Sequence, residues 1–68
     1  MSQSTENRLN VMRNAALKLR GPLKDYARGF LDGWAGTSPQ SAYVNYPNKY
    51  EEGWLEGALL HDGEEKAQ

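Results

Sequence analysis

Two stretches of eight residues follow the same pattern and decide the fold of this chain. The first is Tyr26-Ala27-Arg28-Gly29-Phe30-Leu31-Asp32-Gly33, and the second is Tyr50-Glu51-Glu52-Gly53-Trp54-Leu55-Glu56-Gly57. Both read Tyr-x-x-Gly-aromatic-Leu-acid-Gly, with the two glycines four residues apart. Residues four apart lie on one face of an α-helix, so each stretch predicts a helix with a glycine-lined face.

These glycines need an explanation, because each glycine inside a helix costs about 1 kcal/mol relative to alanine. Gly29, Gly33, Gly53 and Gly57 together cost on the order of 4 kcal/mol, and we assign them, with Gly36, to helix packing. A glycine-lined face lets another backbone come close. Our first interpretation is that the two glycine faces meet, so that two helices cross tightly. The alternative is a face kept for a partner, either a second protomer or a nucleic-acid backbone.

The rest of the sequence predicts an all-α fold of three short helices, over about residues 6–20, 23–35 and 48–61. A loop that contains proline and tyrosine connects the last two helices. We expect residues 6–62 to form a single small helical domain. On this division, residues 1–5 are a disordered N-terminus and residues 63–68 are a frayed acidic tail.

Glycine and proline mark the expected helix ends. The first helix contains neither, and its apolar residues recur at helical spacing as Leu9, Met12, Ala16 and Leu19. Gly21-Pro22 separates the first two helices, because glycine is a common C-terminal stop and proline suits the first turn of the next helix. We expect Gly36 to end the second helix and Asp62-Gly63 to end the third.

The composition argues against an enzyme. A chain of 68 residues leaves little room for a concave pocket with supporting side chains around it. The chain has no cysteine and a single histidine, His61, whereas a protein metal site needs several such ligands. We expect His61 to interact with the C-terminal dipole of the third helix. The sequence thus predicts no catalytic, metal-binding or cofactor-binding residues and no cofactor.

The sequence also predicts where the protein resides. No apolar run approaches the roughly 20 residues of a transmembrane helix. The first residues lack the basic and apolar regions of a signal peptide, and the absence of cysteine fits a reducing compartment. We therefore expect a cytoplasmic protein without a membrane partner.

Charge is divided unevenly along the chain. Residues 1–34 carry six basic and three acidic side chains, a formal charge of +3, whereas residues 35–68 carry two basic and six acidic ones, a formal charge of −4. The N-terminal half therefore suits a polyanion, and the C-terminal half repels one. The alternative interpretation is a solvated surface whose charge is merely uneven.

A longer pattern combines the two stretches. It reads Gly29-Phe30-x-x-Gly33-x-x-Gly36, then a polar linker with a tyrosine, then Tyr50-x-x-Gly53-Trp54-x-x-Gly57. This order resembles the ribosome modulation factor family of short bacterial proteins, over about half of the chain. The resemblance implies two helices joined by a linker. It also implies a protein that binds ribosomal RNA, silences translation during slow growth and pairs ribosomes into inactive dimers.

We therefore predict a small non-catalytic regulator that binds the ribosome or its RNA and modulates translation. The resemblance implies that Arg28, Tyr43 and Trp54 lie near the RNA. Basic side chains neutralise phosphates and aromatic side chains stack on bases. On these grounds the candidate residues for binding RNA or another partner are Arg20, Lys24, Arg28, Tyr43, Tyr46 and Trp54.

Two alternatives to RNA binding remain open. One is a phage- or mobile-element-encoded inhibitor of a host nucleic-acid enzyme, in which the acidic third helix enters a basic channel of the host protein. The other is a homodimeric helical adaptor whose glycine face is the dimer seam. A second copy would add the core that so short a chain lacks.

Overall fold

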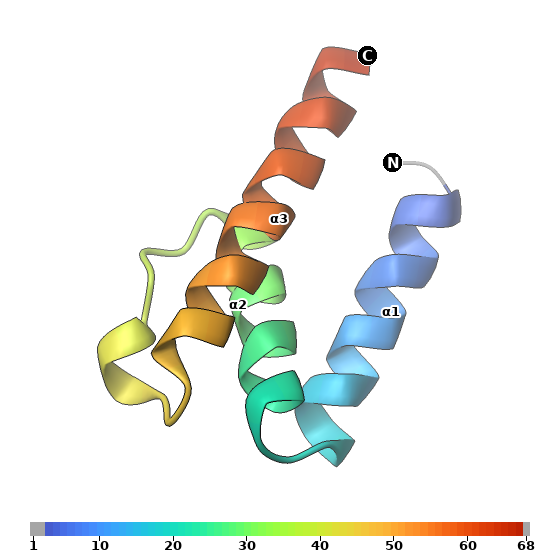
Figure 1. Cartoon of the computed structure of the whole chain (residues 1–68). Coiled ribbons are helices and arrows are strands. Elements are labelled where there is room, and N and C mark those ends of the chain that lie inside the picture. The colour runs from blue at the N-terminus through green and yellow to red at the C-terminus, as the bar shows by residue number, and fades with distance from the viewer. Residues whose placement is uncertain (1–2, 68) are drawn as a thin grey trace.

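Figure 1 shows the structure, a computed structural model that describes the backbone of residues 3–67 and the side chains of residues 3–63. Its elements are α1 (Gln3–Lys18), α2 (Pro22–Ala35), the short 3-10 helix η1 (Ser41–Tyr43) and α3 (Pro47–Ala67). No strand forms over these residues, so the predicted all-α fold of three helices is confirmed. Within the same residues, no helix is long and apolar enough to cross a membrane.

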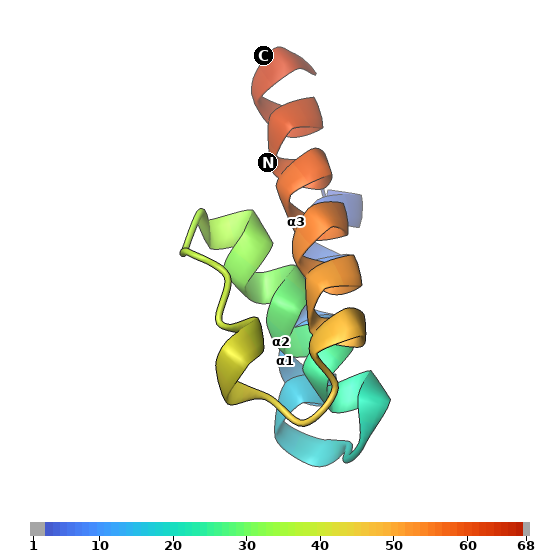
Figure 2. The ribbon, with the colours of Figure 1, turned by 60° about the vertical axis from the view of Figure 1, so that its left-hand side comes forward.

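The two helices that carry the repeated pattern lie side by side and run in the same direction (Figure 1, Figure 2). The linker, residues 36–46, runs back along the pair from the end of α2 to the start of α3. α1 runs in the opposite direction and packs on α2. The parallel direction is what makes the connecting linker long, because a tight turn can join only antiparallel neighbours.

The glycine faces of α2 and α3 meet, which confirms the first interpretation of the pattern. A Cβ atom added to Gly29 would overlap the backbone carbonyl oxygen of Tyr50. In the same way, a Cβ atom added to Gly53 would overlap the carbonyl oxygen of Tyr26. The glycine of each stretch therefore lies against the backbone of the tyrosine that opens the other stretch.

The second glycine of each stretch repeats this exchange one turn further along. Gly33 lies against the carbonyl oxygen of Trp54, and Gly57 lies against that of Phe30. Both contacts join the last glycine of one stretch to the central aromatic residue of the other. The two stretches are thus related by a local twofold axis that runs along the helix pair. Because α3 fills the glycine face of α2, that face is covered within the single chain.

The core lies where the three helices meet. Its buried apolar side chains are Leu9, Ala27, Phe30 and Tyr50. Leu9 brings α1 into this core. The guanidinium carbon of Arg8 lies 5.5 Å from the centroid of the Phe30 ring, a distance that suits a cation–π contact. Phe30 thereby joins α1 to the crossing of α2 and α3.

α1 is displaced towards the N-terminus relative to the prediction. It begins at Gln3 and ends at Lys18, whereas the sequence predicts a helix over about residues 6–20; Met1 and Ser2 lie outside the described residues. Thr5 is only 3% exposed within this helix, which shows that its first turns already pack. Leu19, by contrast, lies beyond the helix and is 41% exposed, because the chain turns there towards α2.

α2 ends as predicted, at a glycine. Gly36 adopts a left-handed φ of 77°, and the N–H of Thr37 donates to the carbonyl oxygen of Asp32 at 3.0 Å. This is the usual glycine-dependent cap of a helix C-terminus. A Cβ atom at Gly36 would meet nothing within 4 Å. The assignment of Gly36 to helix packing is therefore wrong, since it caps α2 instead.

α3 is longer than predicted. It continues through Gly63 to Ala67, so the predicted end at Asp62-Gly63 is wrong; the backbone of residues 63–67 is helical, and Gln68 lies outside the described residues. Gly63 keeps a negative φ, and a glycine ends a helix only where it turns left-handed. His61 consequently lies inside α3, edge-on to Trp34 with ring centroids 5.1 Å apart.

Candidate nucleic-acid interface

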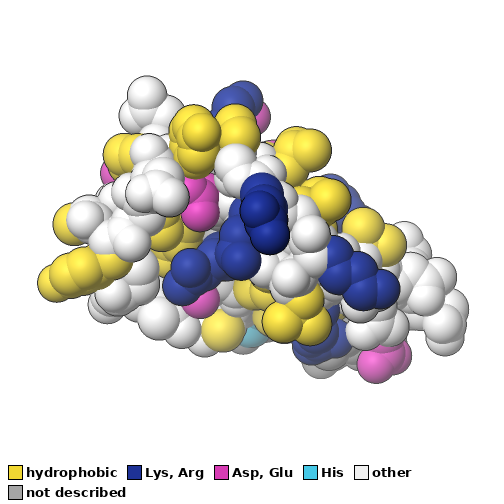
Figure 3. Space-filling view, turned by 90° about the horizontal axis from the view of Figure 1, so that it is seen from below, with side chains coloured by type: hydrophobic (Ala, Val, Ile, Leu, Met, Phe, Trp, Pro, Cys, Tyr) yellow, Lys and Arg dark blue, Asp and Glu magenta, His cyan; other side chains and the backbone are white. Residues whose placement is uncertain are grey.

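The turn between α1 and α2 forms a basic end of the molecule. Arg20 is exposed in this turn, and Lys24 and Arg28 follow on α2, one helical turn apart. Seen from this end in Figure 3, Lys and Arg side chains gather in the middle of the face, between apolar side chains. The three cations predicted as binding residues therefore belong to one region of the surface.

Lys24 and Arg28 also line an open pocket between α1 and α2. The pocket has a volume of about 400 Å³, and its other lining residues are Ala16, Leu17, Leu31 and Asp32. Its walls thus combine two cations and one carboxylate with apolar side chains from both helices. Such a combination suits a partner that is both flat and anionic, as an unstacked nucleotide is.

The acidic residues of α2 are engaged in holding the linker and α3. Asp25 is 7% exposed and accepts the backbone N–H of Tyr46 at 2.8 Å. Asp32 accepts the hydroxyl proton of Tyr50. Asp25 is thereby turned towards the linker, whereas Asp32 bonds Tyr50 and also borders the pocket beside Lys24 and Arg28.

Further hydrogen bonds fix the linker against α3. The N–H of Gln40 donates to the Tyr50 hydroxyl at 3.0 Å, and the indole Nε1 of Trp54 donates to the carbonyl oxygen of Thr37 at 2.8 Å. On this anchored segment, Tyr43 is 83% exposed. η1, which carries Tyr43, lies towards the same end of the molecule as the turn between α1 and α2 (Figure 1, Figure 2).

The predicted binding residues thus fall into two groups. Arg20, Lys24, Arg28, Tyr43 and Tyr46 lie towards the basic end, where Tyr46 is 43% exposed. The sixth candidate, Trp54, lies apart from this group. Its indole donates a hydrogen bond to the linker. That residue is half-buried and helps to hold the linker in place.

The sequence reading missed why each stretch pairs a tyrosine with an acid. The hydroxyl of Tyr26 donates to Glu56, and that of Tyr50 donates to Asp32. Each tyrosine therefore bonds the acid of the other stretch, following the same local twofold axis as the glycines. The signal was present in the pattern, because both stretches carry tyrosine at the first position and an acid at the seventh.

The surroundings of both tyrosines favour the protonated hydroxyl. Burial and the hydrogen bond to Glu56 raise the pKa of Tyr26 from 10.0 to about 12. Burial and the hydrogen bond to Asp32 likewise raise the pKa of Tyr50. Both hydroxyls therefore stay donors across the physiological range.

We expect the protein to lose stability in alkaline solution. A pKa that folding raises means that the fold favours the protonated tyrosine. The contribution of Tyr26 to the free energy of unfolding is thus complete below its unfolded pKa of 10.0. It is lost as the pH rises through the folded-state pKa of about 12. Thermal melts across this range, with an ultraviolet titration of tyrosine ionisation, measure the effect. Tyr26→Phe should remove the most alkaline transition, and a titration in which all tyrosines ionise together near 10 would contradict the prediction.

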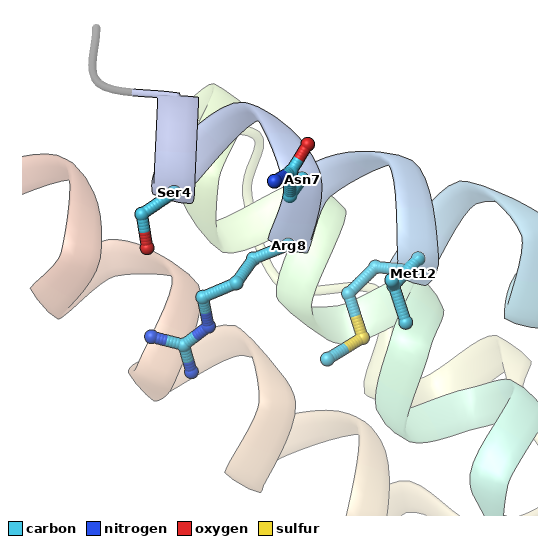
Figure 4. A pocket seen from close by; sticks show the side chains of 5 residues that line it. Ser4, Asn7, Arg8 and Met12 are labelled. Carbon is cyan, nitrogen blue, oxygen red and sulfur yellow. The ribbon is translucent and has the colours of Figure 1, made fainter.

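A second opening lies along α1, with a volume of about 570 Å³ and a lining of Ser4, Asn7, Arg8, Val11 and Met12. Figure 4 shows Ser4 and Arg8 pointing from α1 towards α3. Arg8 already lies over the Phe30 ring, so its cation serves the core. This opening is therefore not part of the candidate interface.

Within residues 3–63, no group of three or more His, Cys, Asp or Glu side chains could hold a metal ion. Comparison with known protein families, curated proteins and solved structures gives no match to this chain. The interface is therefore defined by its own geometry: a basic end with an exposed aromatic residue, on a helix pair that is locked by its glycines.

Proposed function

We propose that this protein is a non-catalytic regulator that binds ribosomal RNA on the ribosome and thereby modulates translation. The observation that supports this most is the grouping of cations near the start of α2, where Lys24 and Arg28 line one pocket and Arg20 lies in the preceding turn. Neutralised phosphates supply most of the affinity of a protein for RNA. The resemblance of the glycine–aromatic pattern to the ribosome modulation factor family supports the same function.

In this proposal the cations and the exposed aromatic residue have separate roles. Arg20 and Arg28 contact phosphates. Tyr43, which is 83% exposed, stacks on an unpaired base, as aromatic side chains do in single-stranded RNA recognition. The pocket beside Lys24 and Arg28 accepts a second base between Leu17 and Leu31. The RNA would therefore be a loop or bulge with splayed bases and not a continuous helix.

The charge of α3 limits the contact to this end. Glu51 and Glu52 are exposed on α3, and their carboxylates repel phosphates. Lys49 lies 3.4 Å from Glu52 and compensates only one of these charges. RNA bound at the basic end would therefore not extend along the outer side of α3.

The direct test is co-sedimentation of the full-length protein with ribosomes through a sucrose gradient. We expect the protein to migrate with ribosomal particles at low salt and to be released at moderate salt, since contacts with phosphates are salt-dependent. A protein that stays at the top of the gradient at both salt concentrations would refute the proposal.

The variant Arg20→Glu/Arg28→Glu tests the basic end itself. We expect it to weaken binding to ribosomal RNA by about tenfold or more and to reduce the salt dependence by about two phosphate contacts. The matched control is Arg20→Lys/Arg28→Lys, which keeps both charges and should bind within about threefold of the original protein, because contacts with phosphates depend mainly on charge. Circular dichroism checks that both variants fold. Unchanged RNA affinity in the glutamate variant would exclude this surface.

A further inference from the structure

The outer side of α3 carries apolar side chains that the fold leaves in solvent. Leu55 is 59% exposed and Leu59 is 68% exposed, and they lie one helical turn apart. Carboxylates flank them on both sides. We call this surface the acidic–apolar face of α3; its residues are Glu51, Glu52, Leu55, Leu59 and Asp62.

A pocket adjoins this face. It has a volume of about 260 Å³ and is lined by Glu51, Trp54 and Leu55 of α3 together with Pro39 of the linker. Glu51 and Leu55 belong both to the pocket and to the acidic–apolar face. The exposed leucines therefore continue into a recess, which gives a partner side chain a place to insert.

The local twofold axis relates this face of α3 to an equivalent face of α2, which is already covered by another helix. The residues of α2 that correspond to Glu51 and Leu55 are Ala27 and Leu31. Ala27 is 1% exposed, and Leu31 is half-buried beside Leu17 of α1. On α2 this side of the helix is therefore the docking place of another helix. On α3 the linker covers only the inner part of the equivalent side, and the outer part stays open.

Charge decides what the open face can accept. Its carboxylates repel RNA, and they also repel the same face of a second copy, because the two acidic surfaces would meet. The helix that occupies the matching place on α2 has the opposite character. α1 carries Arg8, Arg13 and Lys18 against Glu6 alone, so it is basic. Its apolar side consists of Leu9, which is buried, and Met12 and Ala16, which are half-buried.

We propose that the acidic–apolar face of α3 binds a basic amphipathic helix of another protein. The apolar side of that helix covers Leu55 and Leu59, and one of its side chains enters the pocket beside Pro39. Its Lys and Arg side chains meet the flanking carboxylates of Glu51 and Asp62. An amphipathic helix lying on an apolar strip is a common mode of recognition between proteins. This interface is separate from the basic end, so it does not depend on the proposed RNA binding.

The test uses a peptide with the sequence of residues 3–20, which is itself a basic amphipathic helix. It is titrated into the isotopically labelled full-length protein, and binding is followed by nuclear magnetic resonance. We expect saturable shifts centred on the backbone amides of Glu51, Leu55 and Leu59. A scrambled peptide of the same composition should bind about fivefold more weakly or less, because it keeps the charge and loses the apolar stripe.

Variants separate the two parts of the face. Leu55→Asn removes an apolar contact and Glu51→Lys reverses a charge, and we expect each to weaken peptide binding by about fivefold. The matched control is Leu23→Asn, a leucine of 63% exposure on α2, which should leave binding unchanged. No saturable binding, equal binding of the scrambled peptide, or shifts confined to α1 and α2 would overturn the proposal. So would self-association of the protein that Leu55→Asn abolishes, because the occupant would then be a second copy.

Discussion

Replacing Gly53 with alanine is expected to destabilise the protein by about 3 kcal/mol or more, which is a large share of the stability of a domain of this size. The added Cβ atom would overlap the backbone carbonyl oxygen of Tyr26 and come within 2.9 Å of the backbone nitrogen of Phe30. A flexible side chain could rotate away from such an overlap, but backbone atoms of a packed helix cannot. Only separation of α3 from α2 would relieve it. Urea denaturation followed by circular dichroism measures the loss.

Gly63→Ala is the matched control for this prediction. Gly63 belongs to the same helix, and a Cβ atom there would meet nothing within 4 Å. Alanine should therefore stabilise the protein by up to about 1 kcal/mol through its better helix propensity. The same chemical change is thus expected to have opposite signs at two positions of α3. Similar stabilities for the two variants would mean that α2 and α3 do not cross at their glycines.

Replacing Phe30 with alanine is expected to destabilise the protein by about 3–5 kcal/mol. Phe30 is 0% exposed, its ring lies against Arg8 of α1, and its backbone lies against Gly57 of α3. The cavity left by the ring would therefore border all three helices. No side chain nearby can fill the space of an aromatic ring without moving a helix. Thermal and urea denaturation should both show the loss.

Leu23→Ala is the control for the aromatic core. Leu23 is a large apolar side chain of the same helix but is 63% exposed, so its truncation should change the stability by no more than about 0.5 kcal/mol. Limited proteolysis adds a second measurement. If Phe30 joins α1 to the helix pair, α1 should be cleaved early in Phe30→Ala. Equal stability of the two variants would place the core elsewhere.

The crossing of α2 and α3 could be predicted from the sequence because the glycines destabilise each helix, and nothing in the helices themselves compensates for that loss. Glycines such as Gly29 and Gly33 weaken a helix, so their spacing indicates a close backbone contact. The direction of the two helices could not be predicted in this way. A spacing of four residues is the same for parallel and antiparallel neighbours. The bond between Tyr26 and Glu56 follows only from the parallel arrangement and was missed with it.

The helix ends show a second limit of sequence reasoning. Gly36 and Gly63 are the same residue type after similar helical patterns, yet Gly36 turns left-handed and Gly63 does not. The difference arises because the chain must reverse after α2 to reach the start of α3. After Gly63 no such reversal is imposed, and the helix continues.

The candidate interface was predictable where it depended on helical spacing. Lys24 and Arg28 are four residues apart, so helical geometry places them on one side of α2. The place of Tyr43 depends on how the linker returns along the helix pair, and local sequence does not specify that path. Trp54 was assigned to the interface through the resemblance alone, and in the structure its indole donates to the linker instead.

The parallel direction of α2 and α3 also gives the molecule an electrical polarity. The peptide dipoles of two parallel helices add, so both positive N-terminal ends lie at the end that carries Arg20, Lys24 and Arg28. α1 opposes them with its negative C-terminal end, but Lys18 in its last turn offsets that contribution. The helix dipoles and the charged side chains therefore make the same end of the molecule positive. In the field of a polyanion such a molecule experiences a torque, and its orientation is selected during the approach, before any contact forms.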